Sequence, residues 1–197
     1  MLKSVLLCFT LVLAWASQSL ATPQNGEYQK MLDEPTHVQA LIEQLQLAPH
    51  VEGGYYRRTF QADHREQIGT EFGPRYSMTS IFYLLTKSSP VEHFHKNRSD
   101  IMHVFHQGSP ITYYLIHPDG TLETRTLGND LSKGHELQFV VKGGVWKASS
   151  IKAGSDFGLI TEVVAPGFDF ADMTLAKQEK LLQLFPQHEE IITKHTR

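Results

Sequence analysis

Between residues 55 and 164, hydrophobic and polar positions follow one another at the short spacing of β-strands. Runs rich in β-branched and aromatic residues are separated by turns that contain Gly or Pro. The sequence Pro118-Asp119-Gly120 is a strong hairpin signal between two of these runs. Many short strands with such turns indicate a sandwich or a barrel. We expect strands at residues 55–60, 77–85, 91–95, 101–106, 111–116, 122–126, 137–141, 145–148 and 157–164.

A helix is expected on each side of this strand-rich region. Two acids and a proline at residues 33–36 are typical of a helix start, and apolar residues at helical spacing continue from there to about Gln46. Leucines within residues 175–184 predict a closing helix that ends before Pro186. Residues 61–74 are polar, and we predict a loop there.

The first 21 residues have the pattern of a secretory signal peptide. Lys3 gives a positive start, residues 5–15 form an apolar run too short to span a bilayer, and small residues stand at both cleavage positions of Ser19-Leu20-Ala21. We therefore expect a secreted protein without membrane attachment after cleavage, although an uncleaved anchor is an alternative. The mature chain is expected to comprise a loose segment at 22–35, one domain at 36–188 and a tail at 189–197.

Composition narrows the class of function. The chain has 197 residues and a formal net charge of -3. It carries no basic tract, so nucleic acid is a poor candidate for a partner. Cys8 is the only cysteine and lies in the signal segment. The mature protein then has no thiol and no disulfide, which excludes thiol catalysis and cysteine metal sites.

Histidines are concentrated in one short stretch. Four of the 11 histidines fall within residues 92–108. His93 and His95 are two apart, so on a regular strand they share a face, and His103 follows on the next strand. Imidazoles that converge in this way bind a transition metal or an anion. His106 is expected on the opposite face of its strand.

Four stretches of the sequence carry a resemblance to a known family, namely residues 47–58, residues 80–85 with His93, His95 and Gly108, residues 140–146, and residues 164–172. These stretches resemble the RmlC-like cupin superfamily, and within it the fifth cupin family, a domain of unknown function. They cover most of the expected domain, from residue 36 to residue 188. The resemblance implies an all-β fold, namely a cupin-type antiparallel β-barrel (jelly roll) with flanking N- and C-terminal helices, a pocket at one mouth and a homodimer. It implies no particular reaction.

The resemblance is incomplete at the metal positions. Metal-binding cupins typically use two His and a Glu from one motif and a His from a second. Here Ile101 or Asp100 stands at the Glu position, and Trp146 or Lys147 at the second His position. A lysine ammonium repels a cation and is no ligand while it keeps its proton.

Two interpretations of the histidines follow. In the first, His93, His95 and His103, with help from Asp100, bind a divalent transition metal such as Zn, Fe, Cu or Ni. In the second, the pocket holds no metal and binds a small polar or anionic molecule, for which a His would be general base and Tyr55 or Tyr83 the acid. On the strand at 55–60, Tyr55 and Arg57 lie on one face, opposite Tyr56 and Arg58. The expected pocket residues are Arg57, Tyr55, Tyr83, Trp146 and Lys147.

The sequence is also compatible with a role that needs no site, and it contains a possible glycosylation site. A structural or storage protein in an extracellular matrix is compatible with secretion and requires no site at all. Asn97-Arg98-Ser99 is a glycosylation sequon, which would place a glycan on Asn97 between the two histidine-bearing strands.

Overall fold

Two antiparallel sheets form a barrel in the computed structural model, which describes Gly26 and residues 33–197. The predicted signal peptide at residues 1–21 lies outside the described residues. One sheet has the order β1 (Ala48–Pro49), β2 (Tyr55–Gln61), β5 (Thr79–Thr86), β12 (Phe157–Ala165), β7 (Asp100–Gly108) and β10 (Gln138–Val141). The other has the order β13 (Met173–Leu175), β6 (Val91–Asn97), β11 (Trp146–Ile151), β8 (Ile111–Ile116) and β9 (Leu122–Leu127).

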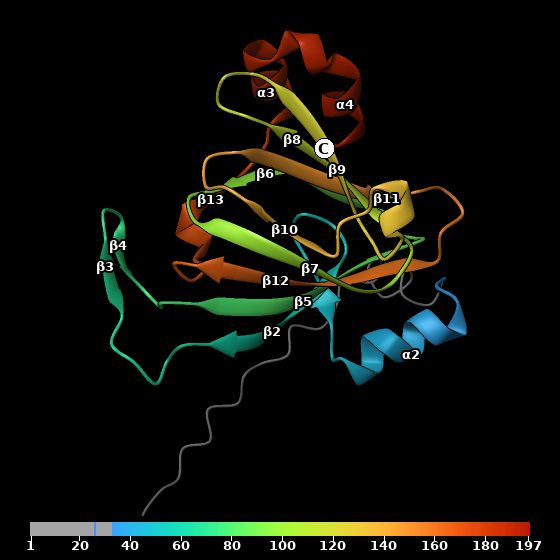
Figure 1. The fold of residues 1–197 in the computed structure, drawn as a ribbon, viewed down its shortest axis with the longest axis horizontal. Coiled ribbons are helices and arrows are strands. Elements are labelled where there is room, and N and C mark those ends of the chain that lie inside the picture. The colour runs from blue at the N-terminus through green and yellow to red at the C-terminus, as the bar shows by residue number, and fades with distance from the viewer. Residues whose placement is uncertain (1–25, 27–32) are drawn as a thin grey trace, which may run out of the picture.

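The two sheets face each other (Figure 1), and the hydrophobic core lies between them. Strand β8 shows how the sequence produces it, because Ile111, Tyr113 and Leu115 alternate with more exposed residues and are buried. They pack against inward residues of the opposite sheet, among them Tyr83 and Ile160. The all-β class and the antiparallel barrel are confirmed.

Helices cover the outer faces at two places. Helix α2 (Thr36–Gln44) buries Val38 and Ile42 against Tyr55 and Leu84 on the outer face of the six-stranded sheet. Helices α3 (Gln178–Leu184) and α4 (Glu189–Lys194) cover the other sheet in the same way (Figure 1). The flanking helices are therefore confirmed. Short 3-10 turns complete the described chain at Leu131–Lys133, Phe170–Asp172 and Pro186–His188.

The structure departs from expectation in three segments. Residues 189–197, expected as a tail, contain α4, whose Ile192 is fully buried because the helix packs on β6 and β8. Residues 61–74, expected as a loop, contain most of a projecting hairpin, β3 (Ile68–Thr70) and β4 (Gly73–Arg75) (Figure 1). The guanidinium of Arg75 ties this hairpin to the barrel by donating to both carboxylate oxygens of Asp172, at 2.6 and 2.9 Å. The short strand β13 was not expected either.

A β-bulge in β6 decides which side chains enter the barrel. His95 is paired with Lys147 of β11, but Glu92 is paired with Ser149, so two residues of β6 stand opposite Ala148 alone. One extra residue reverses the alternation of faces. Glu92 and His95 therefore both turn inward, whereas Phe94 packs outward beneath the C-terminal helices.

None of the helices in the described part of the chain is long and apolar enough to cross a membrane.

Gly53 lies where the loop before β2 passes close to the start of β6, and its backbone conformation requires glycine. Its φ is +104°, and a Cβ there would overlap the carbonyl oxygen of Val91. We expect Gly53→Ala to lower the free energy of unfolding by about 2 kcal/mol or more. Gly69→Ala, where no atom lies within 4 Å of the added carbon, should change stability little. Chemical denaturation measures both, and equal effects of the two substitutions would contradict this account.

Candidate functional site

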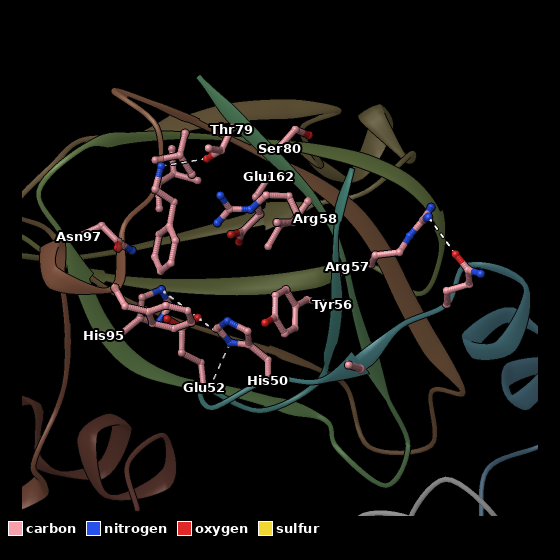
Figure 2. A pocket seen from close by; sticks show the side chains of 17 residues that line it. His50, Glu52, Tyr56, Arg57, Arg58, Thr79, Ser80, His95, Asn97 and Glu162 are labelled. Atoms are coloured by element: carbon pink, nitrogen blue, oxygen red, sulfur yellow. Dashed lines mark hydrogen bonds and ion pairs between the residues drawn. The ribbon is translucent and has the colours of Figure 1, made fainter. Parts of the chain in front are cut away.

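A cavity of about 280 Å³ opens at one mouth of the barrel (Figure 2). Its walls come from the loop before β2, from inward residues of β2, β5, β6, β7 and β12, and from the loop that follows β12. Polar groups line the interior, and two phenylalanines lie on the loop. The principal lining residues are His50, Glu52, Tyr56, Arg58, Thr79, His95, Asn97, Ile101, Glu162, Phe168 and Phe170.

Glu52, Glu92 and His95 form a buried carboxylate–histidine triad beside this cavity. One ligand atom from each lies within 4.8 Å of the others. His95 Nε2 is 3.5 Å from Glu52 Oε2 and 3.8 Å from Glu92 Oε1. The bulge in β6 brings Glu92 and His95 to one face, and the turn at Gly53 brings in Glu52 from a separate segment.

The tautomer of His95 follows from its backbone contact. Its Nδ1 lies 2.9 Å from the carbonyl oxygen of His93, so Nδ1 carries the proton and donates it there. Burial lowers the pKa of His95 well below its usual value, and the nearby charge of Lys147 lowers it further. The imidazole is therefore neutral, and the free lone pair of Nε2 faces the two carboxyl groups. This is the arrangement that protein ligands of a metal adopt.

Lys147 places a positive charge deep in the barrel. Its Nζ is 2.9 Å from Glu162 Oε1 and 3.2 Å from Glu92 Oε1. Burial alone would lower the pKa of Lys147, but the charges of Glu162, Glu92 and Glu52 raise it above its usual value. Burial would likewise raise the pKa of Glu162, but Lys147 and His103 hold it well below its usual value. Lys147 and Glu162 therefore form a charged pair.

The remaining two carboxyl groups have no matching positive charge. Burial raises the pKa of Glu92 to about 7, and burial together with the charge of Glu92 raises the pKa of Glu52 well above its usual value. Glu92 Oε1 accepts no hydrogen bond from any described residue, although Lys147 Nζ is nearby. With three carboxylates and one ammonium, the fully ionised interior carries two surplus negative charges. Two protons or one divalent cation would neutralise them.

His50 adds a second imidazole to the triad. Its Nδ1 lies 3.4 Å from Glu52 Oε2 and accepts a hydrogen bond from the Glu52 amide at 3.3 Å. The ring packs edge-on against Tyr56, with centroids 4.4 Å apart. Burial lowers the pKa of His50 to about 4, so this ring is also neutral near pH 7.

The structure does not bring the histidines of the sequence-based metal set together. His95 lies at the cavity. His103 is fully buried and contacts Glu162 Oε1 at 3.1 Å, but it does not line the cavity. His93 lies outside the cavity, near the C-terminal end of the chain, because the bulge separates its face from that of His95. Asp100 turns to the surface, where it accepts from Lys142 Nζ and from the Gly143 amide.

The structure likewise places most of the expected pocket residues away from the centre of the cavity. Tyr55 packs outward against α2, so the inner face of β2 carries Tyr56 and Arg58 instead (Figure 2). Arg57 lies at the rim and donates to Gln46 at 3.4 Å, away from the centre. Trp146 packs outward near α3 and α4, with the ammonium of Lys96 over its ring.

Tyr83 and Lys147 do point into the barrel, but neither lines the cavity. The hydroxyl of Tyr83 donates to the Gly53 carbonyl at 2.6 Å and so supports the loop that carries Glu52.

Asn97 belongs to the cavity and not to the surface. Its side chain lines the cavity, the residue is 8% exposed, and its Oδ1 accepts no hydrogen bond from any described residue. A glycan attached to this amide does not fit the packing, because the bulge in β6 turns Asn97 inward together with His95. Glycosylation of Asn97 therefore stays a prediction from the sequence alone.

Several site residues were missed by reasoning from the sequence. Glu162 stands in an apolar strand pattern, and an isolated acid there is a signal for a buried, paired carboxylate. Glu52 precedes two glycines, which favours a turn residue, and no local pattern singles out Glu92 or His50. The acids are held in place by long-range contacts, so no local spacing predicts that they meet.

An antiparallel double-sheet barrel with buried imidazoles and carboxylates at one mouth defines the class of cupin-type barrel proteins. The sequence pattern of the family described as "Cupin superfamily (DUF985)" matches residues 39–176, so the chain belongs to this family.

Relatives extend over most of the chain. The "Uncharacterized protein YML079W" of Saccharomyces cerevisiae is 39% identical over 180 residues, which cover 85% of this chain and 89% of that protein. A solved structure, a hypothetical protein from Leishmania major, matches with TM-score 0.75 and 32% identity over 80% of this chain and 97% of its own. Protein SO0799 from Shewanella oneidensis matches with TM-score 0.73 and 39% identity over 81% and 96%. These comparisons define the family and the fold.

Lys147 is expected to be essential for the stability of the interior. Lys147→Met leaves the Glu162 carboxyl group buried without its partner, and losing one member of a buried pair costs about 3–5 kcal/mol. We expect a loss of that size in urea denaturation at pH 7. Lys142→Met is the matched control, because this exposed lysine pairs with Asp100 at the surface, and surface pairs contribute about 0–1 kcal/mol. Comparable losses in both variants would contradict the assigned role of Lys147.

His103 is expected to contribute to acid sensitivity. Burial and the charge of Lys147 lower its pKa from 6.5 to about 4. Between these values the unfolded chain binds a proton that the folded chain does not, so stability falls as the pH falls from about 6.5 to about 4. His103→Gln should reduce the slope of unfolding free energy against pH by about 1.4 kcal/mol per unit in this window.

Denaturation at a series of pH values measures the slope. His106→Gln on the same strand controls for the substitution itself, since this ring bonds Thr161 on the outer side. An unchanged slope in His103→Gln would show that His103 takes up its proton in the folded state at an ordinary pH.

Proposed function

We propose that this protein is a secreted, metal-binding cupin. Glu52, Glu92 and His95 would hold one divalent transition metal ion, and the adjoining cavity would take a small polar molecule next to it. The extracellular location rests on the pattern of residues 1–21, which lie outside the described residues. The homodimer expected from the family resemblance also stays a prediction.

The surplus of buried negative charge is the observation that carries this proposal. Two carboxyl groups and a neutral imidazole share one small volume, and Lys147 and Glu162 already compensate each other. A divalent cation would replace the two protons that Glu52 and Glu92 otherwise need, so binding would release protons.

The chemistry of the donor atoms supports a transition metal. Two carboxylate oxygens and one imidazole nitrogen suit zinc, iron(II) or manganese better than copper, which prefers more nitrogen or sulfur. The hydrogen bond from His95 Nδ1 to a backbone carbonyl fixes the ring in the orientation that a ligand needs. This set differs from the His93, His95 and His103 set expected from the sequence.

A bound metal would supply Lewis acidity for a ligand oxygen. The chain's own residues would do the rest. His50, which accepts a hydrogen bond through Nδ1, would orient Glu52. Tyr56 and Phe168 would form apolar walls against the ligand.

A metal-free binding protein is the second candidate, and one observation favours it. Lys147 Nζ lies 3.2 Å from Glu92 Oε1, an atom of the triad, and an ammonium so close would weaken the binding of a cation. In that case Glu52 stays protonated, and the pocket binds a polar or anionic molecule through hydrogen bonds alone.

Metal content distinguishes the two candidates. We expect about one equivalent of zinc, iron(II) or manganese per chain in tag-free protein after reconstitution and dialysis, measured by mass spectrometry of the element. Glu52→Gln and His95→Gln each remove one ligand and should retain less than about a tenth of that. His93→Gln should retain the wild-type content, because the bulge turns this ring away.

Less than about a tenth of an equivalent in the wild-type protein, with any of these metals, would contradict the metal proposal and favour the metal-free candidate. Equal losses in His93→Gln and His95→Gln would show that the triad is assigned to the wrong residues.

A further inference from the structure

Arg58 is a cation inside the cavity that no acid of the described residues neutralises. It lies on β2 on the same face as Tyr56 and points into the cavity (Figure 2). Its Nη1 donates to Gln61 Oε1 at 2.9 Å, and no carboxylate of the described chain lies within ion-pair distance. By contrast, the buried Arg75 is paired with Asp172. The guanidinium of Arg58 therefore has donors left over for a ligand.

Asn97 supplies a second, independent sign of a ligand. Its side chain lines the same cavity and is more than nine-tenths buried, yet its Oδ1 has no hydrogen-bond partner among the described residues. Buried polar atoms in folded proteins are normally satisfied. An amide left unsatisfied in the wall of a cavity fits a ligand that brings a hydroxyl group.

Charge limits the ligand further. If a divalent cation occupies the triad, it balances Glu52 and Glu92, while Lys147 balances Glu162. The guanidinium of Arg58 is then the uncompensated charge inside the cavity. Arg57 also has no acid partner among the described residues, but it lies at the rim and donates to Gln46. A single negative charge matches the guanidinium of Arg58.

The volume of the cavity also favours a small ligand. The cavity of about 280 Å³ corresponds to about nine water molecules at about 30 Å³ each. A single sugar ring or a shorter chain fits this volume. Phe168, whose ring centre lies 5.9 Å from the Arg58 guanidinium carbon, closes one side with an apolar surface.

We propose that the cavity binds a small hydroxycarboxylate. Its carboxylate would pair with Arg58, and its hydroxyl groups would reach Asn97 and the triad. The charge balance in this inference rests on the proposed function. The pairing of Arg58 with a carboxylate does not, because it depends on the guanidinium alone. A carboxylate presents two oxygens at the spacing of the arginine fork, which makes such pairs strong and specific.

Matched ligands that differ only in the acid group test the inference. Glucuronate is compared with glucose, and glycerate with glycerol, by calorimetry on metal-reconstituted protein. We expect the acid of at least one pair to bind about tenfold or more tightly than its neutral counterpart, since a hydrogen bond to a charged group contributes that much. Arg58→Gln should remove this preference.

Arg57→Gln is the matched control, because the adjacent arginine donates to Gln46 at the rim. It should keep the preference for the acid. Equal binding of both members of each pair, no binding of any, or the same loss in Arg57→Gln as in Arg58→Gln would overturn the inference. The comparison on the wild-type protein needs no variant, so it decides the matter even if Arg58→Gln fails to fold.

Metal content separates this inference from the proposed function. Wild-type protein that holds a metal but shows no preference for the acid contradicts the inference alone. Wild-type protein without a metal that still prefers the acid, and loses that preference in Arg58→Gln, contradicts the metal proposal and supports the assignment of Arg58.

Discussion

The site depends on one interaction, the contact of the Lys147 ammonium with Glu162 and Glu92 in the barrel interior. Lys147 is 2% exposed, and Glu92 and Glu162 are buried as well, so these charges interact with little screening by solvent. Without the lysine, three acids would lie in an apolar barrel, and burial would force all of them to bind protons. With it, Glu162 stays ionised, and His103 can donate to it. The lysine thus makes it possible for acids and imidazoles to share the interior.

Local irregularities of the backbone determine which side chains meet this lysine. The bulge in β6 places Glu92, His95 and Asn97 on the inner face, and Gly53 allows the preceding loop to approach β6 closely enough for Glu52 to join them. Bulges and glycine turns of this kind commonly redirect side chains at functional sites. A regular strand would have placed His93 inside and left Glu92 outside.

The bulge in β6 also explains why the strands could be predicted from the sequence while the residues of the site could not. The longer barrel strands follow from the alternation of apolar residues and from Gly and Pro turns, which are local signals, and they are predicted with small errors at their ends. The short strands β1 and β13 are not predicted. The faces of the strands were predicted less well. On β6 the shared face of His93 and His95 was lost to a bulge, and on β2 the inward residues are Tyr56 and Arg58, because α2 covers Tyr55. The bulge and the position of α2 both depend on contacts between residues far apart in the sequence. The spacing of residue types along the chain does not reveal such contacts.

The proposed ligand binding therefore needs ionisable groups in the interior that reduce the stability of the folded protein. Acids at Glu52 and Glu92 that lack a cation reduce stability as they ionise, because each has a raised pKa and the unfolded chain releases its proton first. Apolar residues at these two positions would remove that cost, as they often do for buried charges. Two acids held beside a neutral imidazole, at the base of a cavity that also exposes Arg58, are thus poorly explained by folding alone. They are well explained by a ligand that brings positive charge to the triad and negative charge to the mouth.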